Sequence, residues 1–274
     1  MPQMQDFLSA ANKQQNAASW PEDRYVDYTM PPASERLACA RDTAKTIEGW
    51  LTDAEGEFLF RVAAGCPPGS PIVEIGSWKG KSTVFLASGI STPGASRVFA
   101  VDPHMQSLED ANARTLDDLK DNLARAGVTD SVEPVVSQSH AYAPTFVQRP
   151  GVVFVDGSHL EEAVRVDLDD WLPKLIDGGV IALHDVINHR WSGPRRALRR
   201  LLWQSRQISA VQFVDSIAWM KKVPNSSASD RWRNRFVAFL LALYEIVAVP
   251  LPQPVQALLR SVYRRTPLKR NALQ

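Results

Sequence analysis

The sequence has few cysteines and no secretion signal, and both absences exclude classes of protein. Only two cysteines, Cys39 and Cys66, stand in 274 residues. They are too few for a disulfide framework and too far apart for a metal knuckle. The first 20 residues lack the basic start and apolar run of a signal peptide. We therefore expect a cytoplasmic protein with one α/β domain and extensions.

Acidic residues are scarce beyond residue 188. Residues 189–274 hold 16 Lys and Arg against 3 Asp and Glu, a net charge of +13. Residues 1–188 hold 15 against 27, a net charge of −12. This asymmetry favours an anionic partner for the second part, either phospholipid head groups or phosphorylated substrates, over nucleic acid. A solvated basic face, or pairing with the acidic first part, explains it equally well.

An apolar stretch near the C-terminus is too short to cross a membrane. It covers 16 residues, 236–251, and contains Glu245, whereas a spanning helix needs about 20. Its flanking arginines and aromatic residues suit a helix that lies on a membrane surface. Docking on a partner subunit of a homo-oligomer, or on the domain itself, stays open.

Apolar runs alternate with helical patterns through the middle of the chain, where Thr52 and Glu55 form a T-x-x-E capping box. We expect strands at 71–76, 96–102, 131–137, 151–157 and 178–185, a strand pair within 208–222, and helices at 53–64, 80–90, 108–126, 161–175 and 194–206. Strands separated by helices predict a Rossmann-like, doubly wound, mostly parallel α/β sheet. The predicted divisions are an N-terminal arm and helix (1–50), the α/β domain (51–222) and a basic, apolar helical extension (223–274).

Acidic residues stand at the ends of four expected strands: Glu74, Asp102, Asp156 and Asp185. A strand interior buried on both faces would reject such side chains. Open parallel sheets bind ligands outside the carboxyl ends of their strands, near the point where the strand order reverses. The sequence therefore predicts a site between about Glu74 and Asp185.

The turn after the first strand reads E-I-G-S-W-K-G, with glycines at 76 and 80. Glycines let the backbone approach a ligand closely, and the helix that follows presents unpaired N–H groups. A dinucleotide-binding turn would read G-x-G-x-x-G. Here the spacing is G-x-x-x-G, with Glu74 two residues before the first glycine. A carboxylate there suits a cationic ligand and would repel a pyrophosphate.

This pattern resembles the first motif of class I methyltransferases that use S-adenosylmethionine (SAM), E/D-x-G-x-x-x-G. The resemblance implies that the turn holds the methionine part of SAM, that an acid after the second strand takes the ribose hydroxyls, and that residues after the third strand line the adenine. The implied cofactor-binding residues are Glu74, Gly76, Ser77, Trp78, Gly80, Ser82, Asp102, Gln138, Ser139 and His140.

A second polar group combines D-G-S-H at 156–159 with His184 and Asp185. Neighbouring parallel strands lie about 4.8 Å apart, so side chains at their ends can meet at one ion or substrate. Oxygen ligands from Asp156 and Asp185 would suit Mg²⁺, which would lower the pKa of a bound hydroxyl. His159 is then placed to act as general base, together with Asp156. The two aspartates could instead cap the segments that follow them.

The second group also resembles a known subgroup. The pattern D-G-x-H-x-x-E-x-V-x-x-D-L, then G-G and H-D, is similar to bacterial sugar O-methyltransferases and to relatives of cephalosporin hydroxylase, over roughly residues 49–186. The resemblance implies Asp156 and Asp185 as metal ligands and His159 as base. His184 stands where metal-dependent relatives often carry a carboxylate. It could be a third ligand, point into the fold or bind substrate.

The sequence thus predicts a SAM-dependent O-methyltransferase that acts on a hydroxyl of a sugar in a glycan, glycolipid or secondary metabolite, with Mg²⁺ as a possible second cofactor. His189 and Trp191, after the fifth strand, are expected to contact this acceptor. We expect no nucleic-acid partner, and peripheral contact with the inner face of the membrane through the extension. The alternatives are a metal-dependent hydroxylase of the cephalosporin-hydroxylase type, a nicotinamide oxidoreductase and a non-catalytic SAM-binding scaffold.

Overall fold

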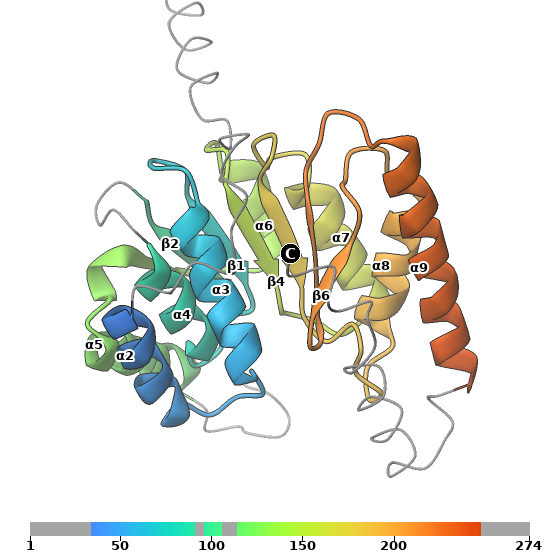
Figure 1. Cartoon of the computed structure of the whole chain (residues 1–274). Coiled ribbons are helices and arrows are strands. Elements are labelled where there is room, and N and C mark those ends of the chain that lie inside the picture. Colours follow the sequence, from blue (N-terminus) through green and yellow to red (C-terminus); the bar gives the residue numbers. More distant parts are fainter. Residues whose placement is uncertain (1–33, 91–95, 106–113, 248–274) are drawn as a thin grey trace, which may run out of the picture.

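A computed structural model describes residues 34–90, 96–105 and 114–247, and its centre is a seven-stranded sheet (Figure 1). The strands are β1 (Ile72–Ile75), β2 (Val98–Asp102), β3 (Val132–Val136), β4 (Val152–Val155), β5 (Val180–Leu183), β6 (Gln212–Val214) and β7 (Ile217–Lys221). Their order is β3-β2-β1-β4-β5-β7-β6. The first five are parallel, and β7 runs antiparallel to β5 and β6. The predicted Rossmann-like, mostly parallel sheet is confirmed.

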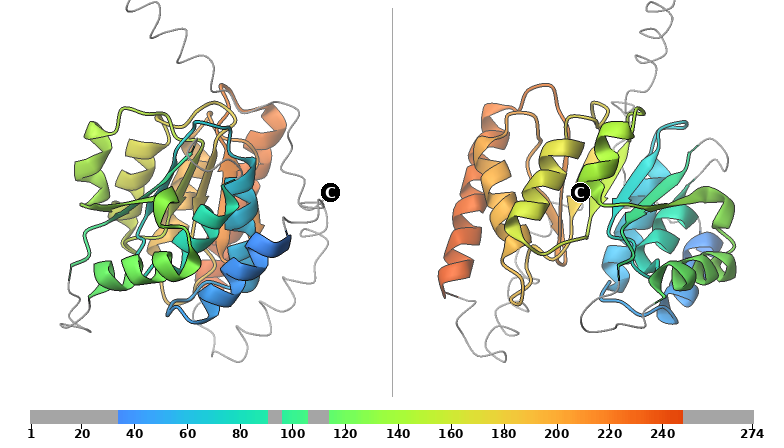
Figure 2. Two further views of the ribbon diagram at one scale, coloured as in Figure 1. Left: turned by 90° about the vertical axis from the view of Figure 1, so that its left-hand side faces the viewer. Right: turned by 180° about the vertical axis from the view of Figure 1, so that it is seen from behind.

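Helices cover both faces of this sheet (Figure 2). They are α2 (Ser34–Lys45), α3 (Asp53–Gly65), α4 (Lys81–Gly89), α5 (Thr115–Ala126), α6 (Ser139–Tyr142), α7 (Glu161–Trp171), α8 (Gly193–Gln204) and α9 (Ala228–Val247), with short 3₁₀ turns η1 (Thr129–Ser131) and η2 (Ala143–Thr145). α2 to α5 bury their apolar sides on one face, and α7 to α9 on the other. Helices on both faces explain why the central strands β1, β4 and β5 are buried along their whole length.

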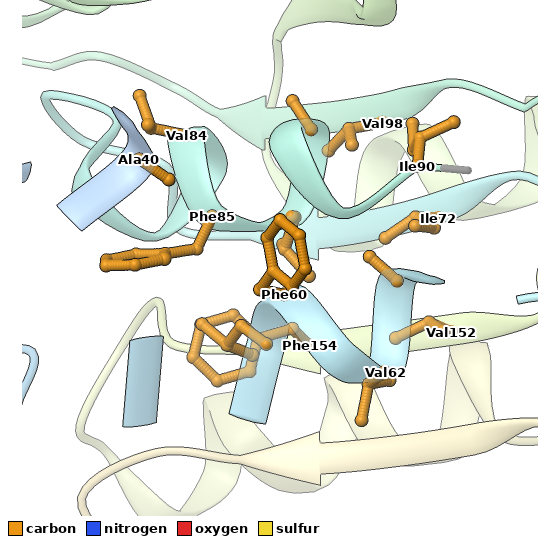
Figure 3. Close-up of a cluster of buried hydrophobic side chains, with 14 of the residues drawn as sticks. Ala40, Phe60, Val62, Ile72, Val84, Phe85, Ile90, Val98, Val152 and Phe154 are labelled. Atoms are coloured by element: carbon orange, nitrogen blue, oxygen red, sulfur yellow. The ribbon is translucent and has the colours of Figure 1, made fainter. Parts of the chain in front are cut away.

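Successive side chains along each strand point to opposite faces of the sheet, so the hydrophobic core consists of two clusters. On the face toward α2 to α5, Ile72 and Val152 pack with Phe60 and Phe85 (Figure 3). On the opposite face, Val73 and its neighbours pack against α7 and α8. Glu74, Asp102, Asp156 and His184 continue the rows that face α2 to α5, because side chains two residues apart point to the same side. The sheet therefore places these polar groups together at its carboxyl edge.

Two expected helix boundaries differ from the structure. α5 begins at Thr115, and residues 108–113 of the helix expected at 108–126 lie outside the described residues. α7 ends at Trp171, not at 175, because Pro173 lacks the N–H that would continue the helix. Helix α9 begins at Ala228, within the extension expected to start at residue 223, and the Ser227 hydroxyl caps its first turn.

The first and last described helices, α2 and α9, pack into the two core clusters that flank the sheet. Leu37 and Ala40 of α2 belong to the first core cluster, and Ala238 and Leu241 of α9 belong to the second. Residues 1–33 and 248–274 lie outside the described residues. The division of the chain at 50 and 222 stays a prediction.

The buried carboxyl of Asp167 tests how α7 packs against its neighbours. This α7 residue is 6% exposed, and burial raises the pKa of its carboxyl to about 6, although a hydrogen bond with Ser139 opposes the rise. A raised folded-state pKa means that the unfolding free energy falls as pH rises from 3.8 through 6 and stays lower above it. We expect Asp167→Asn to raise the unfolding free energy near pH 7.5 by up to about 3 kcal/mol.

Urea denaturation at two pH values checks this prediction. The gain should shrink toward pH 5, where the wild-type carboxyl takes up its proton. Asp169→Asn, on the exposed side of the same helix, serves as the matched control and should give no gain. A gain of equal size at both pH values would contradict the account.

Candidate active site

The glycine turn after β1 lies directly against the end of β4. Gly76 has a left-handed φ of 88°, and a side chain there would come within 2.4 Å of the Asp156 carbonyl oxygen. The Gly76 N–H donates to the Val101 carbonyl, and the Asp156 N–H donates to the Ile75 carbonyl, both at 2.8 Å. Strand order reverses between β1 and β4. This edge is therefore where an open α/β sheet binds its ligand.

Glu74 lies fully buried beneath this turn. The Thr83 hydroxyl donates to its Oε2 atom at 2.5 Å, whereas Oε1 has no hydrogen-bond partner among the described residues. Burial raises the pKa of Glu74 to about 7, against hydrogen bonds from Ser82 and Thr83 that lower it. The buried Ser77 hydroxyl also lacks a partner in the described part of the chain. Such polar atoms favour a ligand with hydrogen-bond donors.

Gly80 caps the next helix. It has a left-handed φ of 87° at the N-cap of α4, and a side chain there would meet the Leu119 Cδ1 atom at 2.5 Å. Both glycines of the motif are thus required by the backbone.

Asp102 accepts hydrogen bonds from the loop after β1 and from the loop after β2. It accepts the backbone N–H of Trp78 at 2.9 Å and that of His104 at 2.7 Å. Both donors have left-handed φ values, 42° and 48°, and such strain gathers at functional sites. The Trp78 ring stacks on Trp50, with centroids 5.5 Å apart. The carboxylate is only half-buried, so it remains accessible to a diol.

The residues expected to line an adenine stand at the start of α6. Gln138 is exposed. The Ser139 hydroxyl accepts the indole N–H of Trp171 at 2.7 Å, and His140 Nδ1 lies 2.8 Å from an Asp170 oxygen. Ser139 and His140 thus contact residues of α7, whereas Gln138 is exposed and, among the described residues, no side-chain hydrogen bond ties it to α7.

His184 is the centre of a second cluster. Its Nδ1 atom lies 3.0 Å from Asp156 Oδ1 and 3.7 Å from Asp185 Oδ1, and its Nε2 atom lies 3.4 Å from Glu55 Oε2. The Glu55 contact lacks hydrogen-bond geometry. Burial disfavours a charged ring, but the carboxylates of Asp156 and Glu55 outweigh it and raise the pKa of His184 to about 11. Without a metal, the ring is an imidazolium at neutral pH.

Sequence reasoning missed the part that Glu55 plays here. The capping box with Thr52 is confirmed. The same carboxylate, 1% exposed, also accepts the N–H and hydroxyl of Ser216 at 2.8 and 2.6 Å. Burial raises the pKa of Glu55, yet the His184 charge and these hydrogen bonds bring it below its usual value. The capping box already explained why a glutamate stands at position 55. The sequence therefore contained no indication that its side chain also contacts His184.

His159 and Asp185 form the pair that can move a proton. His159 Nε2 lies 2.8 Å from Asp185 Oδ2, and the Asn188 amide donates to Oδ1 at 2.9 Å. Asp185 has a left-handed φ of 58°. Burial raises the pKa of Asp185, but hydrogen bonds from His159 and Asn188 and the His184 charge lower it overall. A carboxylate that orients an imidazole is the arrangement of a general base.

The loop after β5 covers this pair. The Trp191 ring stacks on His159, with centroids 4.8 Å apart and planes inclined by 20°. The half-buried His189 lies on the same loop. Arg195, fully buried, donates to the Asn188 carbonyl at 2.9 Å, and its Nε lies 3.7 Å from Glu245 of α9. Helix α9 thus contacts the residue that braces the loop.

The second cluster has donor groups suited to a divalent cation. One ligand atom each from Asp156, His184 and Asp185 lies within 4.8 Å of the others. Two carboxylates and one imidazole match the ligands of several divalent metals. Glu55, at the far nitrogen of His184, occupies the place of a carboxylate that orients a ligating imidazole. The donor set fits once His184 loses its Nδ1 proton.

Gly76→Ala tests the contact between β1 and β4. The strained backbone and the clash with Asp156 should lower the unfolding free energy by about 2 to 4 kcal/mol. Gly157→Ala is the matched control, because the atom nearest to a side chain there is Ile75 Cγ2, at an ordinary contact distance of 3.4 Å. Chemical denaturation of both variants measures the difference, and equal stability would refute the proposed clash.

Known proteins match this region in sequence. A family described as a methyltransferase domain matches residues 73–186, which include Glu74, Asp102, Asp156 and Asp185. The chain is similar to a catechol O-methyltransferase of Mycobacterium tuberculosis, with 30% identity over 170 residues. The match covers 60% of this chain and 71% of that relative.

Two solved structures share the fold. An O-methyltransferase from Bacillus cereus in complex with SAH has a TM-score of 0.53 and 21% identity, over 74% of this chain and 98% of that one. The O-methyltransferase TomG from Streptomyces achromogenes, involved in tomaymycin synthesis and in complex with SAM, has a TM-score of 0.52 and 19% identity, over 77% and 99%. At these identities the similarity concerns the fold.

Proposed function

The chain belongs to the class I SAM-dependent O-methyltransferases, and on that premise we propose that it methylates a hydroxyl of a sugar in a glycan, glycolipid or secondary metabolite. The observation that carries this proposal is the His159–Asp185 pair, 2.8 Å apart, at the same edge of the sheet as the glycine turn. An oriented base next to a cofactor turn is what deprotonation of an alcohol requires. Family membership disfavours the hydroxylase, nicotinamide and scaffold alternatives.

The glycine turn fits SAM, which supplies an electrophilic methyl group when bound. The unpartnered Oε1 of Glu74 would accept from the ammonium group. Gly76 and Gly80 let the backbone come close, and the half-buried Asp102 would accept the ribose hydroxyls. Gln138, exposed at the start of α6, would contact the adenine.

His159 would take the proton of the acceptor hydroxyl. Its Nε2 atom is bonded to Asp185, which leaves Nδ1 as the nitrogen that accepts a proton. The Asp185 carboxylate then stabilises the imidazolium that forms. With 32% of its side chain exposed, His159 stays within reach of a substrate. Proton removal makes the oxygen nucleophilic toward the methyl group.

Trp191 would position the acceptor. Its ring is 40% exposed and stacked on His159, so it presents a flat surface on which a sugar or aromatic ring can pack. Similarity to a catechol O-methyltransferase makes a catechol the second candidate acceptor. A catechol and many sugars share a pair of adjacent hydroxyls, and a panel containing both kinds of acceptor separates them.

We further propose that Asp156, Asp185 and His184 hold a divalent cation, such as Mg²⁺. The three donors lie close enough for one ion, which would lower the pKa of an acceptor hydroxyl bound to it. As a ligand through Nδ1, His184 would be neutral and its proton would pass to solvent, so that the metal would replace the imidazolium as the cation among the carboxylates.

Replacing the base tests the function. We expect His159→Gln to lower kcat for methyl transfer from labelled SAM by about 10² to 10⁴, because the acceptor keeps its proton. SAM affinity, measured by calorimetry on the same variant, should stay within about threefold of wild type, since the cofactor turn is untouched. A variant that retains wild-type kcat would show that His159 is not the base.

Metal removal tests the second cluster. We expect EDTA followed by dialysis to abolish most activity and Mg²⁺ or Mn²⁺ to restore it, because a metal-bound hydroxyl loses its proton more easily. Electron paramagnetic resonance should detect Mn²⁺ bound to the wild type, and Asp156→Asn should weaken this binding. Full activity in EDTA together with no bound Mn²⁺ would rule the metal out.

A further inference from the structure

Helix α9 packs on the molecule through one narrow face. Asn234, Ala238 and Leu241 are its buried residues, and their spacing of four and three residues places them on one side of the helix. The Asn234 carbonyl oxygen accepts the backbone N–H of Val211 at 2.8 Å. α9 is the outermost helix of its layer and packs mainly on α8 (Figures 1 and 2).

The opposite side of α9 is an apolar stripe. Seven large apolar side chains are between 36% and 73% exposed: Trp232, Phe236, Phe239, Leu240, Leu243, Ile246 and Val247. At 3.6 residues per turn, these positions lie opposite the buried face. Trp232 and Phe236 stack with centroids 5.6 Å apart. A contiguous apolar stripe of this length is the mark of an interaction surface.

Arginines border the apolar stripe. A groove of about 510 Å³ lies between α8 and α9, and its charged lining is three arginines against one acid, Glu161 of α7. The arginines are Arg196, Arg199 and Arg200 of α8, and Trp203 and Phe239 also line the groove. The groove opens beside the stripe, because Phe239 belongs to both. Cationic and apolar groups therefore face solvent together on this side of the molecule.

The acidic residues of α9 are already used. Asp230 accepts the backbone N–H of Ala210 at 3.1 Å. Glu245 pairs with Arg196 and Arg199 on α8. In the described ranges, neither Arg233 nor Arg235 has a carboxylate within ion-pair distance, and Arg235 lies over the Trp203 ring at 5.5 Å. The surface therefore carries an excess of positive charge.

These properties together select the class of partner. Nucleic acid would engage the arginines and leave the apolar stripe exposed, and a neutral apolar partner would offer no anionic group to Arg233 and Arg235. An anionic membrane offers acyl chains to the stripe and phosphates to the arginines. In addition, residues 248–274 contain five Lys and Arg and no Asp or Glu. Among the described residues, no helix is long and apolar enough to cross a membrane.

We propose that the outer face of α9, with the arginines and Trp203 of α8, binds the surface of an anionic phospholipid membrane. The helix lies in the plane of the interface, with its aromatic side chains among the head groups. This placement suits an acceptor that is itself lipid-linked. It does not depend on the identity of that acceptor or on the chemistry of His159.

Vesicle flotation of the full chain tests this proposal. The wild type should bind vesicles of phosphatidylcholine with phosphatidylglycerol at least about tenfold more tightly than vesicles of phosphatidylcholine alone, and less tightly in high salt. The double variant Phe239→Glu/Leu243→Glu should bind at least about tenfold more weakly, because two charges oppose burial of the stripe. Val147→Glu, at an exposed apolar position elsewhere, is the matched control and should bind as wild type.

A charge variant and an assembly measurement complete the test. Arg233→Glu/Arg235→Glu should lose the preference for anionic vesicles while keeping SAM affinity. Equal flotation of the wild type and Phe239→Glu/Leu243→Glu would overturn the proposal. So would a wild type that floats with neither kind of vesicle but forms a dimer, in light scattering, that this variant abolishes. The stripe would then be an interface between two copies of the chain.

Discussion

The close approach of Gly76 to the Asp156 peptide is the constraint on which the site depends. β1 and β4 are far apart in the sequence but adjacent in the sheet, and a side chain at 76 would come within 2.4 Å of the Asp156 carbonyl. Because the two backbones meet, the turn expected to hold the cofactor and the cluster expected to activate the acceptor share one edge. Methyl transfer needs such proximity, since the reacting atoms must lie about 3 Å apart.

Charge balance is the second requirement of this edge. Asp156, Asp185 and Glu55 surround His184, and buried carboxylates without a cation would be strongly destabilising. The cluster therefore needs a cation, which is either the protonated His184 ring or a divalent metal ion. The same groups that prepare the chemistry also join α3 to β4 and β5, so stability and function are linked at this point.

Local sequence patterns predicted most of the scaffold. Buried parallel strands are short apolar runs between helices, and acids at their ends are conspicuous, which is why Glu74, Asp102, Asp156 and Asp185 could be placed at one edge. The contacts between elements could not be predicted. The Glu55 contact with His184 and the stacking of Trp191 on His159 depend on how α3 and the loop after β5 pack. The apolar stretch at 236–251 was visible in the sequence, but which side of α9 faces solvent followed only from the packing of this helix on α8.

The central claim is that the glycine turn accepts a cationic sulfonium compound and not a pyrophosphate. Isothermal titration calorimetry of the purified chain, with SAM and NAD titrated separately, tests this most directly. The account predicts one SAM bound per chain and no measurable heat from NAD, because the unpartnered carboxylate of Glu74 attracts an ammonium group and repels phosphate. Binding of NAD with no affinity for SAM would contradict it.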